Sequence, residues 1–113
     1  MKSTKTDIVV IGSGPGGHAA AFYAADRGKK VIMVEKDDVL GGVCLNVGCI
    51  PSKAYLHAAK LIQEAQESDF RGISFNKAKL DLNKMRAWKN SVVGKLTGGI
   101  ATLAKSRGVE VMY

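Results

Sequence analysis

DIVVIGSGPGG, at residues 7–17, is the stretch that decides the fold. Residues 7–11 are an apolar, largely β-branched run without polar alternation, which predicts a strand buried on both faces of a parallel sheet. The glycine-rich half leads into an alanine-rich segment, residues 18–27, which predicts a helix that Gly28 terminates. Residues 31–34 are a second apolar run. The first third of the chain therefore predicts a strand–turn–helix–strand unit.

The turn carries three glycines in the pattern G-x-G-x-x-G, Gly12, Gly14 and Gly17. The pattern alone says little, but here it follows a strand, opens a helix and precedes a second strand that ends at Glu35, which predicts a dinucleotide site. Gly12 would permit the tight turn, Gly14 would let a pyrophosphate approach, and Gly17 would let helix and strand pack closely. Glu35 would accept hydrogen bonds from ribose hydroxyls and repel a 2′-phosphate, which excludes NADP at this site.

The remaining sequence predicts two long helices and a third strand. Residues 52–68 form one helix, with Leu56, Ala59 and Ile62 on its apolar face, and residues 69–79 form a loop with a very short strand at most at 73–75. Asp81 is expected to cap a helix that ends at Gly108, and a strand begins at residue 109. Right-handed crossovers would give half of a doubly wound α/β fold, with a parallel sheet and helices on both faces.

The chain of 113 residues suits a single domain. Its formal net charge of +7 fits either anionic ligands or a lysine-rich solvated surface. No basic run is interleaved with aromatic residues, so no nucleic-acid partner is expected. No apolar run approaches the roughly 18 residues of a membrane span, and the N-terminus does not resemble a signal peptide. These features predict a cytoplasmic protein without a membrane partner.

The chain's two cysteines lie in GGVCLNVGCIPSK, at residues 41–53. In a regular α-helix the Cα atoms of residues five apart are about 8 Å apart, whereas a disulfide needs roughly 4.4–6.8 Å. If Cys44 and Cys49 are partners, the backbone between them must form a turn or a distorted helical turn, which Gly48 would allow. Pro51 suits the first turn of a following helix, whose N-terminus would favour a thiolate at Cys49. In a reducing cytosol such a pair indicates a redox site rather than a structural bridge.

Residues 41–53 match the redox motif G-G-[TV]-C-x-N-x-G-C-x-P-S-K, and through it the chain resembles the flavin-dependent disulfide oxidoreductases. RAWK at residues 86–89 and LTGG at 96–99 extend the resemblance along the chain and favour the branch that oxidises dihydrolipoamide. The resemblance implies a Rossmann-like, three-layer FAD-binding α/β domain with a parallel sheet. Residues 1–113 would be its N-terminal segment, without the nicotinamide and dimerisation domains.

By this resemblance the first dinucleotide is FAD. The residues implied on its ADP half are Gly12, Gly14, Gly17 and Glu35. Residues Gly42, Val43 and Cys44 would run along the diphosphate towards the flavin, and Lys53 would lie near the isoalloxazine. Cys49 would be the thiol beside the flavin, and Cys44 the thiol that meets the substrate.

The resemblance also implies the reaction and the partners. A dihydrolipoyl thiolate would attack Cys44, Cys49 would leave as a thiolate, and the second substrate thiol would close lipoamide. The electrons would then pass through the flavin to NAD as co-substrate. The implied partners are the lipoyl domain of a 2-oxoacid dehydrogenase complex and, in the full-length family, a second copy in a homodimer.

Other interpretations share some of these features. A glutathione or mercuric reductase carries the same redox motif. A zinc site of Cys44, Cys49 and His57 has an uncommon spacing and lacks a fourth ligand, so no metal is expected. Neither His18 nor His57 matches the family's His-Glu acid–base pair, and both are expected at structural or surface positions. The chain alone is also interpreted as a non-catalytic FAD-domain fragment without turnover, which would self-associate through an uncovered sheet edge.

Overall fold

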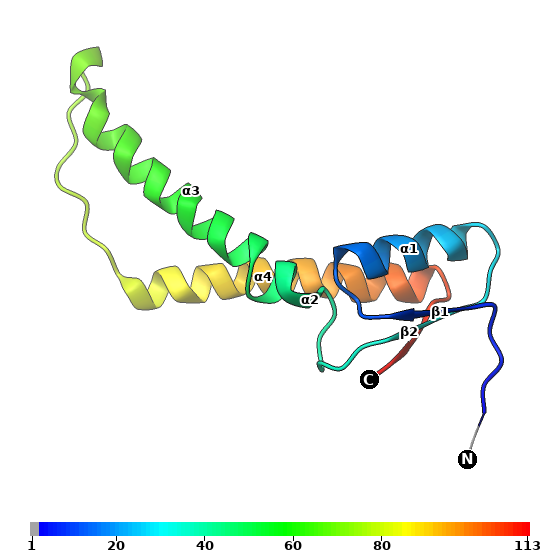
Figure 1. Cartoon of the computed structure of the whole chain (residues 1–113). Helices are drawn as coiled ribbons and strands as arrows, with labels where there is room; N and C mark the ends of the chain where they lie inside the picture. The colour runs from blue at the N-terminus through cyan, green and yellow to red at the C-terminus, as the bar shows by residue number, and fades with distance from the viewer. Residues whose placement is uncertain (1–2) are drawn as a thin grey trace.

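A computed structural model describes residues 3–113 as an α/β fold (Figure 1). Its elements are β1 (Ile8–Ile11), α1 (Pro15–Asp26), β2 (Val31–Val34), α2 (Gly42–Asn46), α3 (Cys49–Gln66), the 3₁₀ turn η1 (Glu67–Arg71), α4 (Leu82–Ser106) and β3 (Glu110–Met112). The predicted strands and long helices are confirmed. The short helix α2 was not predicted as a helix, and residues 73–75 form no strand.

The three strands form a parallel sheet in the order β1-β2-β3. Met33 of the central strand lies opposite Val10 on one side and Val111 on the other. All but the last residue of β2 are buried, as predicted. The same prediction is wrong for β1, where Val9 is 56% exposed and Ile11 88% exposed. As an edge strand, β1 lacks the second neighbour that helps to bury β2.

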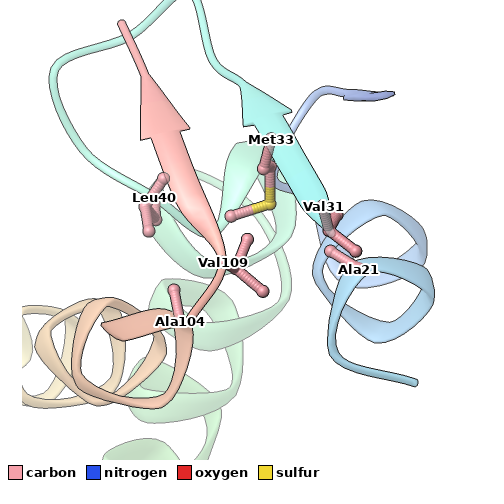
Figure 2. Close-up of a cluster of buried hydrophobic side chains, with 6 residues drawn as sticks. All are labelled: Ala21, Val31, Met33, Leu40, Ala104 and Val109. Atoms are coloured by element: carbon pink, nitrogen blue, oxygen red, sulfur yellow. The ribbon is translucent and has the colours of Figure 1, made fainter. Parts of the chain in front are cut away.

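Both helices that pack on the sheet, α1 and α4, cover the same face. Figure 2 shows Ala21 of α1 and Ala104 of α4 beneath the strands, together with Met33 and Val109 in the core. The small alanine side chains let both helices approach the sheet closely. Because the strand order advances in one direction, two right-handed crossovers place both helices on one face. Within residues 3–113 the expected helix layer is therefore formed on one face and not on both.

The helical arm, which we define as residues 49–95, extends away from the sheet (Figure 1). The radius of gyration is 19.8 Å, whereas a compact domain of this length has about 13 Å. The predicted apolar face of α3 is only partly right: Ile62 is half-buried, but Leu56 is 66% exposed. The two helices of the arm diverge from their meeting point near α2, so much of α3 lies beyond the reach of α4. No helix within the described residues is long and apolar enough to cross a membrane.

Asp81 caps α4 as predicted. Its Oδ1 accepts hydrogen bonds from the backbone N–H groups of Asn83 and Lys84, each at 3.0 Å. These bonds satisfy two of the donors that a helix N-terminus leaves without intrahelical partners. The cap therefore fixes where the loop ends and α4 begins.

Replacing Asp81 with alanine should lower the free energy of unfolding by about 1 kcal/mol, the usual cost of losing an N-cap. Asp81→Asn is the matched control because its side-chain oxygen keeps both hydrogen bonds. Urea denaturation followed by circular dichroism measures the difference. Equal losses in the two variants would show that the hydrogen-bonded cap is not the stabilising feature.

Candidate functional site

The glycine turn between β1 and α1 has the backbone geometry that its motif predicts. Gly12 has a φ of +91°, in the left-handed region that favours glycine. A Cβ placed on Gly17 would lie 1.9 Å from the carbonyl oxygen of Gly12. Only a glycine at position 17 therefore lets the first turn of α1 lie this close to the strand.

The N-terminus of α1 is open. Its N-cap is Gly14, which supplies no side-chain cap, and its first turn holds no acidic residue. A Cβ on Gly14 or Gly16 would meet no atom within 4 Å, so the space beside the turn is free. Free N–H groups and the positive end of the helix dipole favour an anion at this place.

Glu35 follows β2 and is buried, with four hydrogen bonds from the chain itself. Its Oε2 accepts from the backbone N–H of Ser13 at 2.9 Å and from the Ser13 hydroxyl. Its Oε1 accepts from the N–H groups of Lys36 and Asp37, at 2.7 and 3.2 Å. The Ser13 hydroxyl is the largest of the causes that lower the pKa of Glu35 to about 2, against an opposing effect of burial. A carboxylate offers about four lone-pair sites, so a ribose hydroxyl here would have to share or replace one of these donors.

The redox turn, residues 40–48, lies directly against the glycine turn. A Cβ on Gly42 would be 2.7 Å from the Cα of Gly14. The N–H of Gly41 donates a hydrogen bond to the Ser13 hydroxyl at 3.0 Å. Two motifs that are separate in sequence thus form one surface, and Ser13 joins them.

Asn46 closes the redox turn from inside. Its side-chain amide donates to the carbonyl oxygens of Leu40 and Gly42, at 3.1 and 2.9 Å. Sequence reasoning assigned no role to Asn46 or Ser13. Asn46 stands in the quoted redox motif, which was a signal for it, whereas only the folded chain brings Ser13 to Glu35 and Gly41.

The backbone between the two cysteines is bent, which is the geometry expected of them if they pair. Cys44 belongs to α2 and Cys49 is the first residue of α3, with a break in the helix at Val47 and Gly48. A Cβ on Gly48 would lie 3.0 Å from the carbonyl oxygen of Val43, so the bend is tight. Both cysteines are free thiols in the structure; Cys44 is half-buried and Cys49 is exposed.

The Cys44 thiol is affected by its surroundings. The neighbouring Cys49 thiol is the main cause that raises the pKa of Cys44, and partial burial adds to it. The Lys53 ammonium opposes both effects. Cys49 itself lies at the N-terminus of α3, which has no acidic residue in its first turn. Cys44, Cys49 and Lys53 are therefore gathered at one end of the arm.

A hollow of about 290 Å³ borders the redox turn. Its lining residues are Asp37, Asp38, Val39, Gly42, Val43, Asn46 and Val47. The hollow connects the loop after Glu35 with the residues predicted to follow the diphosphate. It is therefore a recess beside the place where the two turns meet.

The two histidines are not part of the proposed redox site. His18 is half-buried, and its Nδ1 is 2.9 Å from the carbonyl oxygen of Ser13, which is a structural contact as expected. His57 is exposed on α3. Among residues 3–113, no group of three or more His, Cys, Asp or Glu side chains is placed to hold a metal ion.

A strand–turn–helix unit joined to a dithiol turn defines a class of flavin- and dithiol-dependent oxidoreductases, and comparison with known families agrees. Residues 6–113 match the family model described as pyridine nucleotide-disulphide oxidoreductase, and the chain belongs to this family. It is 53% identical over 111 residues to the dihydrolipoyl dehydrogenase of Haemophilus influenzae, and 53% identical over 108 residues to that of Bacillus subtilis. These alignments cover 98% and 96% of this chain but 23% of each relative, so the chain spans about a quarter of their length.

Family membership implies FAD as the cofactor, and the residues present fit one half of it. The open N-terminus of α1 suits a diphosphate, and Gly42 continues that surface towards the two thiols. Glu35 stands at the end of β2, where an adenosine ribose is expected, although its oxygens already have partners. The binding roles of the individual residues stay predictions.

Gly17→Ala should destabilise the fold by about 1–3 kcal/mol, the usual cost of overpacking, because the new methyl group overlaps the Gly12 carbonyl. Gly98→Ala in α4 is the matched control. A Cβ there meets no atom within 4 Å, so it should stabilise the helix by up to about 1 kcal/mol. Urea titration of both variants measures the two effects. A Gly17→Ala variant as stable as wild type would refute the close packing.

Stability should fall in acid through Glu35. Its folded pKa of about 2 lies below its ordinary value of 4.5, so its contribution is fully present above that value and lost as the pH falls from 4.5 towards 2. The measurement is the free energy of unfolding of wild type and Glu35→Gln between pH 2 and 7. The difference between them should be largest above pH 5 and shrink as the pH approaches 2. A difference that is independent of pH would contradict an ionised, hydrogen-bonded Glu35.

Proposed function

We propose that the protein containing this chain oxidises dihydrolipoyl groups with FAD and a cysteine pair, and that this chain supplies the adenine side of the flavin site and the dithiol. The contact between Gly42 and Gly14 carries the proposal, because it brings the redox turn beside the glycine turn. The similarity to two dihydrolipoyl dehydrogenases over nearly the whole chain supports this choice of substrate.

The cysteines carry out the exchange when they are joined as a disulfide. One thiolate of the dihydrolipoyl group attacks Sγ of Cys44, the Cys44–Cys49 bond breaks, and Cys49 leaves as a thiolate. The second substrate thiol then attacks its mixed disulfide with Cys44, which closes the lipoyl ring and releases Cys44. The substrate is oxidised by two electrons, and the pair is reduced to the dithiol state present in the structure.

FAD, when bound, would supply the two-electron redox chemistry that links the dithiol to NAD. Cys49 is the thiol proposed to lie beside the flavin in this electron transfer. Cys49 is the first residue of α3, whose first turn holds no acidic residue, and Lys53 follows one turn further along the helix. The exposure of Cys49 also fits the proposal, because the thiol beside the flavin must be open to a bound cofactor.

The proposed partners follow from the same reaction. They are the lipoyl domain of a 2-oxoacid dehydrogenase complex and a second copy of the complete protein, with a cytoplasmic location. A protein of the glutathione or mercuric reductase type is the alternative within the family. For the 113-residue chain alone, the exposed β1 and the extended arm favour an inactive fragment that self-associates.

The complete gene product, expressed and purified, provides the test. We expect a yellow protein with a flavin absorbance band that reduces NAD with dihydrolipoamide. Cys44→Ser and Cys49→Ser should each lower turnover on the order of 1000-fold or more, with flavin retained. Gly98→Ala, far from the thiols in sequence, serves as the control and should keep normal turnover. Oxidation of NADH or NADPH with glutathione disulfide or Hg(II) as the electron acceptor would favour the alternative, and a colourless protein without turnover would refute flavin catalysis.

A further inference from the structure

We propose that Ser13 is a positioning residue that fixes the start of α2, and thereby Cys44, to the glycine turn and Glu35. The inference rests on the proposed function of the two turns and deepens it by naming the residue that couples them. Ser13 occupies a variable position of the glycine motif, so the motif itself assigns it nothing.

The contacts of Ser13 lie at the centre of the site. It is fully buried, at 0% exposure. Its hydroxyl donates to Oε2 of Glu35 and accepts from the N–H of Gly41 at 3.0 Å. A hydroxyl has one proton, and an ionised carboxylate only accepts, so the direction of both bonds is determined. The negative charge of Glu35 therefore holds the hydroxyl in the orientation that receives Gly41.

The backbone of Ser13 is held on both sides as well. Its N–H donates to Oε2 of Glu35 at 2.9 Å, and its carbonyl oxygen lies 2.9 Å from Nδ1 of His18 in α1. Ser13 is thus tied to the end of β2, to the first turn of α1 and to the start of α2. A residue held in this way cannot follow a movement of the redox turn, so it acts as a fixed support.

Cys44 depends on this support because the Ser13–Gly41 hydrogen bond joins the start of α2 to the glycine turn, beside the buried Leu40 and the contact of Gly42 with Gly14. The helix spans five residues, and its N-cap Gly41 has a φ of +107° and provides no side-chain cap. Gly41 is buried and also packs against Leu45, since a Cβ on it would lie 2.7 Å from the Cβ of Leu45. Loss of the Ser13 hydroxyl leaves the Gly41 N–H buried without its partner. Without this hydrogen bond the redox turn is held less firmly to Ser13, and Cys44, three residues after Gly41, moves with it.

Ser13→Ala in the complete gene product is the first variant, and Ser91→Ala is the matched control. The Ser91 hydroxyl is exposed and donates only to the carbonyl oxygen of Trp88 in its own helix. Ser13→Cys keeps nearly the same volume with a much weaker donor and acceptor. It is the second variant in case the alanine variant does not fold, which circular dichroism decides.

The readout is the rate at which reduced, flavin-free protein is alkylated by iodoacetamide at Cys44. Mass spectrometry of the tryptic peptide 37–53 separates Cys44 from Cys49 by fragment ions. Ser13→Ala should raise the rate at Cys44 by about tenfold, which corresponds to one lost hydrogen bond of ordinary net strength. Amide hydrogen exchange should show faster exchange at Gly41. Ser13→Cys should change both quantities in the same direction, and Ser91→Ala should change neither.

A Cys44 rate within twofold of wild type in the folded Ser13 variant, with unchanged exchange at Gly41, would overturn the proposal. Equal acceleration at Cys44 in Ser91→Ala would overturn it too, because the effect would then be unspecific. The assay needs neither flavin nor lipoyl substrate. A failure of the proposed function therefore shows in the turnover test alone, and a failure of the Ser13 inference shows here.

Discussion

Gly42 lies against Gly14 with no room for a Cβ on Gly42, and this approach sets how the glycine turn and the redox turn meet. The glycine at position 42 is needed, because a Cβ there would lie 2.7 Å from the Cα of Gly14, whereas a Cβ on Gly14 would meet no atom within 4 Å. The flanking elements depend on it: α1 starts directly after Gly14, and α2 starts at Gly42. With the two turns together, the proposed cofactor would have one continuous surface from Glu35 towards the thiols.

A buried negative charge stabilises this arrangement. Glu35 has four hydrogen-bond donors around its carboxylate, which compensate for the loss of water. Two of these donors belong to Ser13, whose hydroxyl also receives the N–H of Gly41. The charge therefore serves as a structural element that orders both turns, in addition to the ribose contact proposed for it. An incoming ribose would meet a carboxylate that is already oriented.

The helical arm is packed more sparsely than the sheet region. Its helices touch near α2 and then diverge, so that apolar side chains such as Leu56 and Phe75 stay exposed. Leu61 is exposed to the same extent as Leu56, at 66% each. The chain spans about a quarter of the length of its relatives. Cys49 begins α3, the helix on which Leu56 and Leu61 are exposed. Cys49 thus lies at the junction between a packed sheet region and a sparsely packed arm.

Sequence alone determined the features that depend on neighbours along the chain: the strands, the long helices and the Asp81 cap. Local propensity, apolar periodicity and glycine conformation control these features. The tertiary structure decided that both sheet helices share one face, that Ile11 and Leu56 are exposed, and that Ser13 joins Glu35 to Gly41. These outcomes depend on which distant segments meet. A residue's own neighbours carry no information about that, because burial and hydrogen-bond partners are set across the fold.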